Sequence, residues 1–240
     1  MPNKPLPPLN PATKKPLTPE DLAHIFSLEC SKQELDTEHA WIDIPEEVLD
    51  MYKYYRATPL VRAYALEKAL DTPAHIYFKN ESVNPLGSHK INSALPQCYY
   101  CREEGVTNVT TETGAGQWGA ALSYAAKVFG LESAVYQVKI TLQQKPYRGI
   151  LMRTFGATVT GSPSMSTRAG KDIITRDPNN SGSLGTAISE AIELATTTPN
   201  CKYTLGSVLN HVALHQTIIG LEAEKQMAMT GEYPDTIIAC

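Results

Sequence analysis

Short apolar runs alternate with longer helical stretches along the middle of the 240-residue chain. The expected strands cover residues 75–79, 108–111, 134–140 and 157–160. The expected helices between them cover residues 88–104, 116–130 and 145–155. Strands that alternate with helices at this spacing predict an α/β fold with a parallel sheet and right-handed crossovers.

Further elements are expected on both sides of this alternation. The first twenty residues hold seven prolines and predict an extended, polyproline-like arm, which ends at a helix start capped by Thr18. A second helix is expected over 45–55, and 56–60 (RATPL) is extended because a residue before proline avoids the helical region. Towards the C-terminus, helices are expected over 166–175, 184–196 and 211–229.

The last six residues, DTIIAC (235–240), have the pattern of a buried parallel strand, and neither a turn nor a helix follows them. In parallel α/β folds, ligands bind in the loops that follow the carboxyl ends of the strands. We therefore expect this chain to be a C-terminally truncated fragment.

Composition narrows the class of protein. Hydrophobic residues make up 42% of the chain and charged residues 19%, and the net charge of -4 comes without a basic cluster for nucleic acid. No apolar stretch reaches the roughly 18 to 20 residues that span a bilayer. Five scattered cysteines indicate reduced thiols, and Cys98 and Cys101 are interpreted as buried helix residues, not zinc ligands. A cytoplasmic globular protein is expected.

Lys90 lies in NPLGSHKINSA (84–94), where an extended run gives way to a helix. A cation at a helix N-terminus faces the positive end of the helix dipole. Lys90 is therefore either an ordinary surface residue that tolerates this penalty or a lysine that gives up its proton readily.

A second motif, ETGAGQWG (112–119), contains G-x-G-x-x-G after a strand and before a helix. The dinucleotide-binding interpretation is disfavoured, because the next strand ends in QVKIT without the required acidic residue. Closely spaced glycines ahead of a helix still form a site for a carboxylate or a phosphate. A buried Glu112 beside such a site is expected to have a raised pKa, whereas a solvated Glu112 would not.

Taken together, these two motifs suggest a nucleophilic lysine and a proton-transferring carboxyl group at the same edge of a parallel sheet. Such a lysine suits Schiff-base chemistry, and pyridoxal phosphate is the aldehyde cofactor that uses it. The anion loop would then hold the carboxylate of an amino acid.

The chain resembles the tryptophan synthase beta-chain family, with a type II pyridoxal-phosphate fold. The resemblance extends from about residue 20 to residue 240, and some stretches match the second, beta-like subtype. The stretches that carry it are RATPL (56–60), FKNESVNPLGSHKINSA (78–94), TETGAGQWG (111–119), QKPYRGILMRTFGATV (144–159) and YTLGSVLNHVALHQTIIGLEA (203–223). Trp118 stands where the main branch of the family has histidine, which leaves the local pocket shape open.

The resemblance implies the condensation of L-serine with indole to give L-tryptophan and water. Lys90 would carry pyridoxal phosphate and remove the α-proton of serine, and His89 and Asn92 would contact the cofactor. Glu112 would protonate the departing hydroxyl group. The residues that would hold the substrate carboxylate are Thr113, Gly114, Ala115, Gly116 and Gln117. No metal ligand is expected within the chain.

The resemblance also implies an organisation into parts. Residues 1–55 form an arm with helices, 56–88 contribute to a cofactor domain, 89–205 form an α/β domain with a mobile subdomain, and 206–240 begin the cofactor domain. The phosphate-binding loop and most of a monovalent-cation site would follow Cys240, so weak cofactor retention is expected. A homodimer and a tryptophan synthase alpha chain are the implied partners.

Other interpretations remain open. A serine/threonine dehydratase, threonine synthase or cysteine synthase shares a motif close to NPLGSHK, although the glutamate of ETGAGQWG speaks against it. A non-catalytic assembly subunit is the alternative of another class. His211 and His215, four residues apart, are interpreted as interface histidines because no third metal ligand is evident. Lys145 and Arg148 are interpreted as solvated charges.

Overall fold

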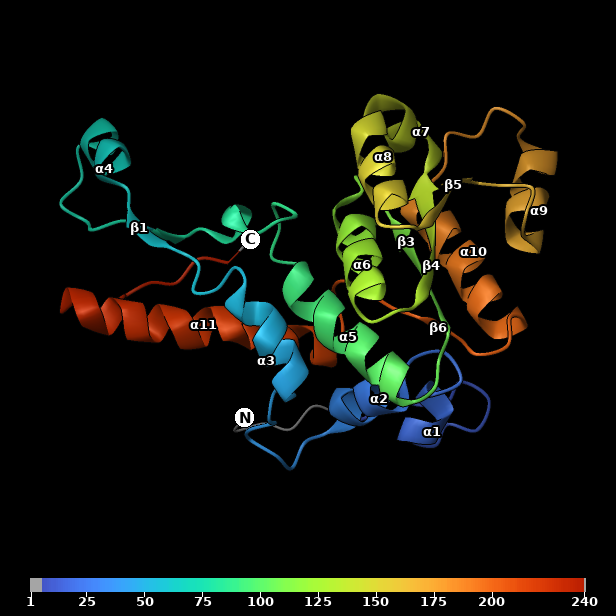
Figure 1. Ribbon diagram of the computed structural model, residues 1–240, viewed down its shortest axis with the longest axis horizontal. Coiled ribbons are helices and arrows are strands. Elements are labelled where there is room, and N and C mark those ends of the chain that lie inside the picture. Colours follow the sequence, from blue (N-terminus) through green and yellow to red (C-terminus); the bar gives the residue numbers. More distant parts are fainter. Residues whose placement is uncertain (1–5, 240) are drawn as a thin grey trace.

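A four-stranded parallel sheet forms the centre of the fold in the computed structural model, which describes residues 6–239 (Figure 1). Its strands lie in the order β5-β4-β3-β6. The strands are β3 (Asn108–Thr113), β4 (Glu132–Val138), β5 (Thr158–Ser162) and β6 (Cys201–Tyr203). All three pairings are parallel, so the predicted α/β architecture is confirmed.

Helices cover both faces of this sheet. Neighbouring side chains of a strand point to opposite faces, so the apolar residues of one strand pack against helices on each side. Val135 of β4 packs with Ala120 and Met152 of the helices on one face. Tyr136, the next residue, packs with Ala187 and Ala191 on the other. The helices are α6 (Gln117–Val128) and α8 (Pro146–Thr154) on the first face and α10 (Leu184–Thr197) on the second, with α7 (Lys139–Gln144) and α9 (Arg168–Arg176) between them in the chain.

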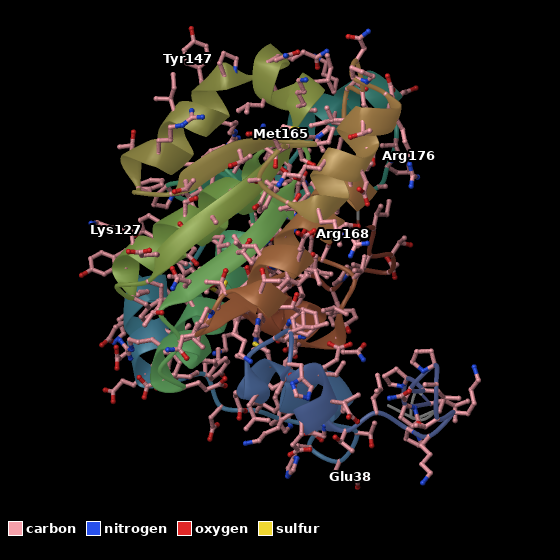
Figure 2. All side chains as sticks on the ribbon, turned by 90° about the vertical axis from the view of Figure 1, so that its right-hand side faces the viewer. Glu38, Lys127, Tyr147, Met165, Arg168 and Arg176 are labelled. Carbon is pink, nitrogen blue, oxygen red and sulfur yellow. The ribbon has the colours of Figure 1, made fainter. Side chains whose placement is uncertain are left out.

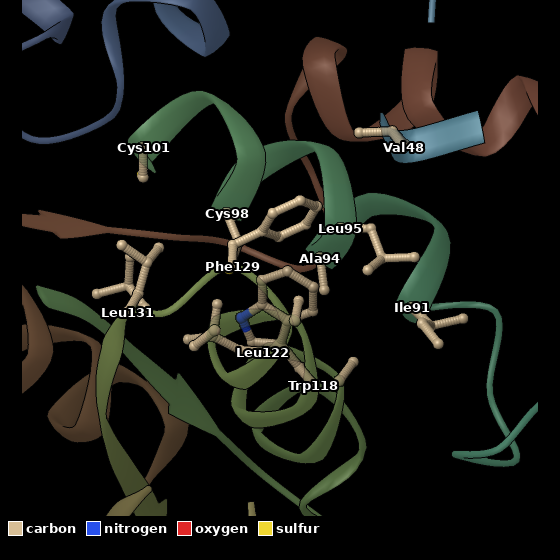
Figure 3. Packing of buried hydrophobic residues seen from close by; sticks show 14 of the residues in the cluster. Val48, Ile91, Ala94, Leu95, Cys98, Cys101, Trp118, Leu122, Phe129 and Leu131 are labelled. Carbon is tan, nitrogen blue, oxygen red and sulfur yellow. The ribbon is translucent and has the colours of Figure 1, made fainter. Parts of the chain in front are cut away.

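The largest apolar core lies between α5 (Ile91–Glu103) and α6 (Figure 3). Ile91 and Leu95 of α5 and Leu122 of α6 are fully buried there, and Val48 of α3 (Glu46–Lys53) closes it from another side. Fully burying one such side chain stabilises a protein by about 1.5–3 kcal/mol. The first turn of α5, which follows Lys90, is therefore anchored by the main core.

A separate two-stranded sheet corrects one expectation from the sequence. β1 (Leu60–Arg62) and β2 (Tyr77–Lys79) pair antiparallel around α4 (Tyr64–Leu70), so residues 75–79 do not join the parallel sheet. The physical reason is exposure: Val61 and Phe78 are 36% and 48% exposed, whereas strands of a parallel sheet are buried on both faces. This sheet packs beside α11 (Asn210–Thr230), away from the four-stranded sheet (Figure 1).

The N-terminal segment folds back on itself, unlike the extended arm expected. Leu9 forms an antiparallel bridge with Pro16, and Thr18 caps α1 (Pro19–Leu22) in a capping box with Asp21. Residues 1–5 of the predicted arm lie outside the described residues. The helix α2 (Leu28–Leu35), the helix α4 and the 3-10 turn η1 (Glu81–Val83) are additions that the apolar pattern did not predict.

The expected strand at the end of the chain is wrong for residues 235–239, which have no strand partner within the described part of the chain. Ile237 and Ile238 are 80% and 88% exposed. An apolar, β-branched run becomes a strand only when a neighbouring strand supplies hydrogen bonds, and none lies beside it. Cys240 lies outside the described residues.

Cys98 and Cys101 are buried on α5 with free thiols, as expected, and Cys30 and Cys201 are also buried and free. Across residues 6–239, none of the helices combines the length and the apolar character that a membrane crossing requires.

A buried network of ion pairs connects the antiparallel sheet with α11 and α5. The Arg56 guanidinium is 4% exposed and pairs with Glu81 at 3.0 Å and with Glu222 of α11 at 2.6 Å. Lys79 of β2 adds a second cation to Glu222 at 2.8 Å, and Asn92 of α5 donates to Glu81 at 3.0 Å and accepts from Arg56 at 2.8 Å. The network therefore holds β2, α11 and the first turn of α5 together.

Replacing Arg56 should destabilise the fold severely. Arg56→Met leaves two largely buried carboxylates short of a cation, which typically costs about 3–5 kcal/mol. The matched control is Arg102→Met, because Arg102 pairs with Glu47 at the surface, where the loss should be about 0.2–1 kcal/mol. The free energy of unfolding in urea measures both. Similar losses for the two variants would contradict a structural role for the buried network.

Candidate active site

Lys90 is the residue that precedes the first turn of α5, as the sequence predicted for a lysine at a helix start. The loop before it is held by Asn84, whose side chain accepts from Leu86 N at 3.0 Å and donates to Ser88 O at 2.9 Å. Lys90 itself is half-buried, and its Nζ donates to the backbone carbonyl of Gly206 at 3.1 Å. The amine thus faces the segment that follows β6.

The surroundings of Lys90 favour the neutral amine. Burial lowers the pKa of Lys90, and the nearby Glu112 carboxylate offsets only part of that effect. A lysine with a lowered pKa offers its lone pair for nucleophilic attack and proton removal near neutral pH. Of the two interpretations left open by the sequence, the structure thus favours a lysine that gives up its proton, and burial is the main cause.

Glu112 lies near the carboxyl end of β3 and is 5% exposed. The Tyr203 hydroxyl of β6 donates to its Oε2 in a short hydrogen bond. Burial raises the pKa of Glu112, while the bond from Tyr203 and the charge of Lys90 oppose the shift without cancelling it. A carboxyl group with a raised pKa holds its proton to a higher pH than an exposed one, which suits a group that gives a proton to a ligand.

The anion loop, residues 113–117, connects β3 to α6. Gly116 precedes the helix with φ of 95°, a conformation that side chains disfavour. A Cβ at Gly116 would also lie 2.7 Å from Arg148 Cβ, so glycine is required there. The Thr113 hydroxyl accepts from Gly119 N at 3.2 Å, and the first N–H groups of α6 have no acceptor within the helix. The loop therefore has the backbone geometry of an anion site.

His89 and Asn92 differ in their availability to a ligand. His89 is exposed, and the surrounding protein together with the charge of Lys90 lowers its pKa. Asn92 is fully buried, and its side chain accepts from Tyr55 and Arg56 and donates to Glu81 and Gln216. A cofactor contact by the Asn92 side chain would have to replace one of these bonds.

Sequence reasoning missed three contributors to the site. Tyr203 and Gly206 both lie in the run KYTLG (202–206), which had no expected strand and no chemical motif to mark it. Arg148 was interpreted as solvated, but it is half-buried and donates to Leu86 O at 3.3 Å. It thereby joins the Lys90 loop to the anion loop. Its neighbour Tyr147 is 82% exposed and projects outward (Figure 2).

Trp118 and the two histidines of α11 pack against other parts of the fold. Trp118 is buried against Gly206 and donates to the Thr111 hydroxyl at 2.7 Å, so it has a packing role. His211 pairs with Glu34 of α2 at 2.9 Å, and His215 contacts Ser93 at 3.0 Å. Both histidines are interface residues between α11 and its neighbours, as predicted.

The arrangement brings together an amine, a carboxyl group and an anion site at the carboxyl ends of parallel strands. Burial moves the pKa of Lys90 down and that of Glu112 up, so the two pKa values shift towards each other. The site can therefore bind an anionic ligand and move protons at two points on it.

Known proteins share both the sequence and the fold. A family model described as "Pyridoxal-phosphate dependent enzyme" matches residues 51–240. "Tryptophan synthase beta chain 2" of Thermotoga maritima is 55% identical over 240 residues, which cover all of this chain and 57% of that protein. The protein of the same name from Aquifex aeolicus is 56% identical over 232 residues, covering 97% of this chain and 53% of the relative. The chain spans about half the length of these curated relatives.

Solved structures show the same fold at lower identity. The Escherichia coli diaminopropionate ammonia lyase in its apo form has a TM-score of 0.59 and 16% identity, covering 78% of this chain and 53% of that chain. A fungal L-serine ammonia-lyase from Rhizomucor miehei has a TM-score of 0.55 and 22% identity, covering 72% and 47% respectively. These likenesses show the fold alone.

Replacing Glu112 with glutamine should make the protein more stable than the wild type at high pH but not at low pH. Burial raises the folded-state pKa of Glu112 above the ordinary value of about 4.5, so the folded state favours the protonated carboxyl group. The protonated Glu112 carboxyl group stabilises the folded state fully below the pKa that it has in the unfolded chain. This contribution is lost as the pH rises through its pKa in the folded protein. Glu112→Gln removes this loss and keeps an acceptor for Tyr203. A gain of about 1 kcal/mol at pH 8 is typical for such a replacement, with little gain at pH 4.

Thermal unfolding of both proteins across this pH range measures the difference. Glu132→Gln, at the exposed start of β4, is the matched control and should leave the pH profile unchanged. A gain that is independent of pH would contradict a raised pKa for Glu112.

Proposed function

The chain belongs to the pyridoxal-phosphate-dependent enzyme family, and from this premise we propose that it serves the condensation of L-serine with indole to give L-tryptophan and water. The observation that carries the proposal is the opposed pair of Lys90 and Glu112 beside the anion loop. The 52–56% identity to tryptophan synthase beta chains supports the choice of reaction within the family.

The residues present fit the cofactor at its point of attachment. Lys90 combines partial burial, a lowered pKa and a backbone carbonyl that orients Nζ, which are the properties that a cofactor-bearing lysine needs. Lys90 would hold pyridoxal phosphate covalently, and the exposed His89 would lie beside it. When bound, the cofactor supplies an electron sink for a carbanion at the substrate Cα.

The chain's own residues would position the substrate and move its protons. The anion loop would hold the serine carboxylate with the backbone N–H groups at the start of α6. Lys90 Nζ would accept the Cα proton, and Glu112 would donate a proton to the departing hydroxyl oxygen. Tyr203 would keep Glu112 in one orientation through its bond to Oε2, which leaves Oε1 to act on the ligand.

The proposed organisation and partners follow from the same similarity. Residues 56–88 and 206–240 would belong to a cofactor domain, and support comes from β1 and β2, which pack near α11 rather than on the parallel sheet. A homodimer and an alpha-chain partner remain proposals from the resemblance. The buried free cysteines fit a reducing, cytoplasmic compartment.

Covalent trapping tests the cofactor attachment. Incubation of the full-length protein with pyridoxal phosphate, followed by borohydride reduction, should label the peptide that contains Lys90. Lys145, which is exposed three residues before Arg148, is the internal control and should stay unlabelled. Peptide mass spectrometry locates the label, and a label that persists in Lys90→Met would overturn the assignment.

Product analysis tests the reaction. The full-length protein with pyridoxal phosphate and L-serine should form tryptophan only when indole is added. Glu112→Gln should lower the turnover number by about 10²–10⁴-fold, the usual contribution of a proton-transferring group, while Lys90 is still labelled. Pyruvate as the product with or without indole would favour a dehydratase over the proposed reaction.

A further inference from the structure

Gln137 stands out among the buried polar residues because its amide is isolated. It lies on β4, one residue before the end of the strand, and is fully buried. Neither Nε2 nor Oε1 has a hydrogen-bond partner among the described residues. Buried polar atoms in folded proteins almost always have partners, and an unpartnered amide destabilises the fold that contains it. Such an exception calls for a functional explanation.

The isolated amide lies beneath the anion loop. Gln137 is the strand partner of Thr113, the first residue of that loop. A Cβ built on Gly116 would lie 3.5 Å from Gln137 Nε2. The amide therefore reaches the residue that starts α6, where backbone N–H groups are free to bind an anion.

The protein groups around the amide are committed elsewhere. The Thr113 hydroxyl accepts from Gly119 N, and the Gly114 carbonyl accepts from the Thr141 hydroxyl. Arg148, whose side chain packs against Gly116, donates to the Leu86 carbonyl and forms no ion pair with any carboxylate in the described part of the chain. The region thus offers a hydrogen-bond donor beside an uncompensated positive charge, and both favour an anion.

We propose that Gln137 completes the substrate-carboxylate site, with Nε2 donating to the carboxylate that the loop holds and Oε1 accepting a loop N–H. This inference rests on the proposed function, because it assigns the loop to an amino-acid carboxylate. The neutral amide of Gln137 and the backbone of the loop recognise a carboxylate by its shape and through their N–H hydrogen-bond donors. Gln137 therefore contributes to specificity for a free amino acid over its amide or ester.

Substrate pairs measure this specificity directly. The full-length protein loaded with pyridoxal phosphate is titrated with L-serine and with L-serinamide, which lacks the carboxylate charge, and binding is followed by the cofactor absorbance. Gln137→Met should weaken L-serine binding about fivefold to tenfold and leave L-serinamide binding unchanged. Gln137→Glu, with the same shape and a negative charge, should weaken L-serine binding at least about tenfold through repulsion.

Stability supplies the second readout, because a structural role and a binding role predict opposite signs. Gln137→Met removes two unpartnered buried atoms, so the ligand-free protein should unfold at an equal or higher temperature. Ser162→Ala is the matched control: Ser162 is also buried and unpartnered, and it lies on β5 opposite Val138. It should likewise not lower the unfolding temperature, and it should leave L-serine binding unchanged.

The outcomes separate the two proposals. If the wild-type protein fails to bind L-serine, the proposed function fails. If it binds L-serine and Gln137→Met keeps the wild-type ratio of L-serine to L-serinamide affinity, only the role of Gln137 is overturned. A lower unfolding temperature for Gln137→Met with unchanged L-serine binding would also overturn it, since the amide would then have a structural partner. Gln137→Glu tests the same ratio if the methionine variant does not fold.

Discussion

The arrangement of the site depends on the ion pairs of the buried Arg56 guanidinium. The guanidinium is paired on two sides by Glu81 and Glu222, which come from segments far apart in the chain. Burying one cation between two anions is favourable only when every hydrogen bond is made, and this network also uses Lys79 and Asn92. Asn92 lies two residues after Lys90, so α11 and the antiparallel sheet help to fix where the lysine begins its helix.

Burial then gives the two proton-transferring groups opposite properties. The same loss of water lowers the pKa of a lysine and raises that of a glutamate, so one low-dielectric site prepares both. Tyr203 at the end of β6 orients Glu112, and the Gly206 carbonyl just after β6 orients Lys90. The anion loop and Gln137 lie at the same carboxyl edge of the sheet, where parallel strands open towards a ligand.

Much of the fold could be predicted from local pattern. The expected strands and helices between residues 108 and 162 follow apolar runs and glycines that act within a few residues. The structure has them with small shifts at their ends and adds α7, whose first residues were expected to be strand. The run at 75–79 was misplaced, because its antiparallel partner at 60–62 gives no periodic signal at three residues. Residues 235–239 have strand composition but no neighbouring strand, and composition alone cannot supply one.

The site divides in the same way. The sequence by itself determined Lys90 at a helix start, Glu112 at a strand end and a glycine loop before a helix, because these are properties of adjacent residues. Only the tertiary structure decided what surrounds them: the hydroxyl of Tyr203 on Glu112, the carbonyl of Gly206 on Lys90 and the isolated amide of Gln137 under the loop. The physical reason is that burial and hydrogen bonding set the pKa values. Both arise between segments that are far apart in the chain, such as Lys90 and Gly206, which are 116 residues apart.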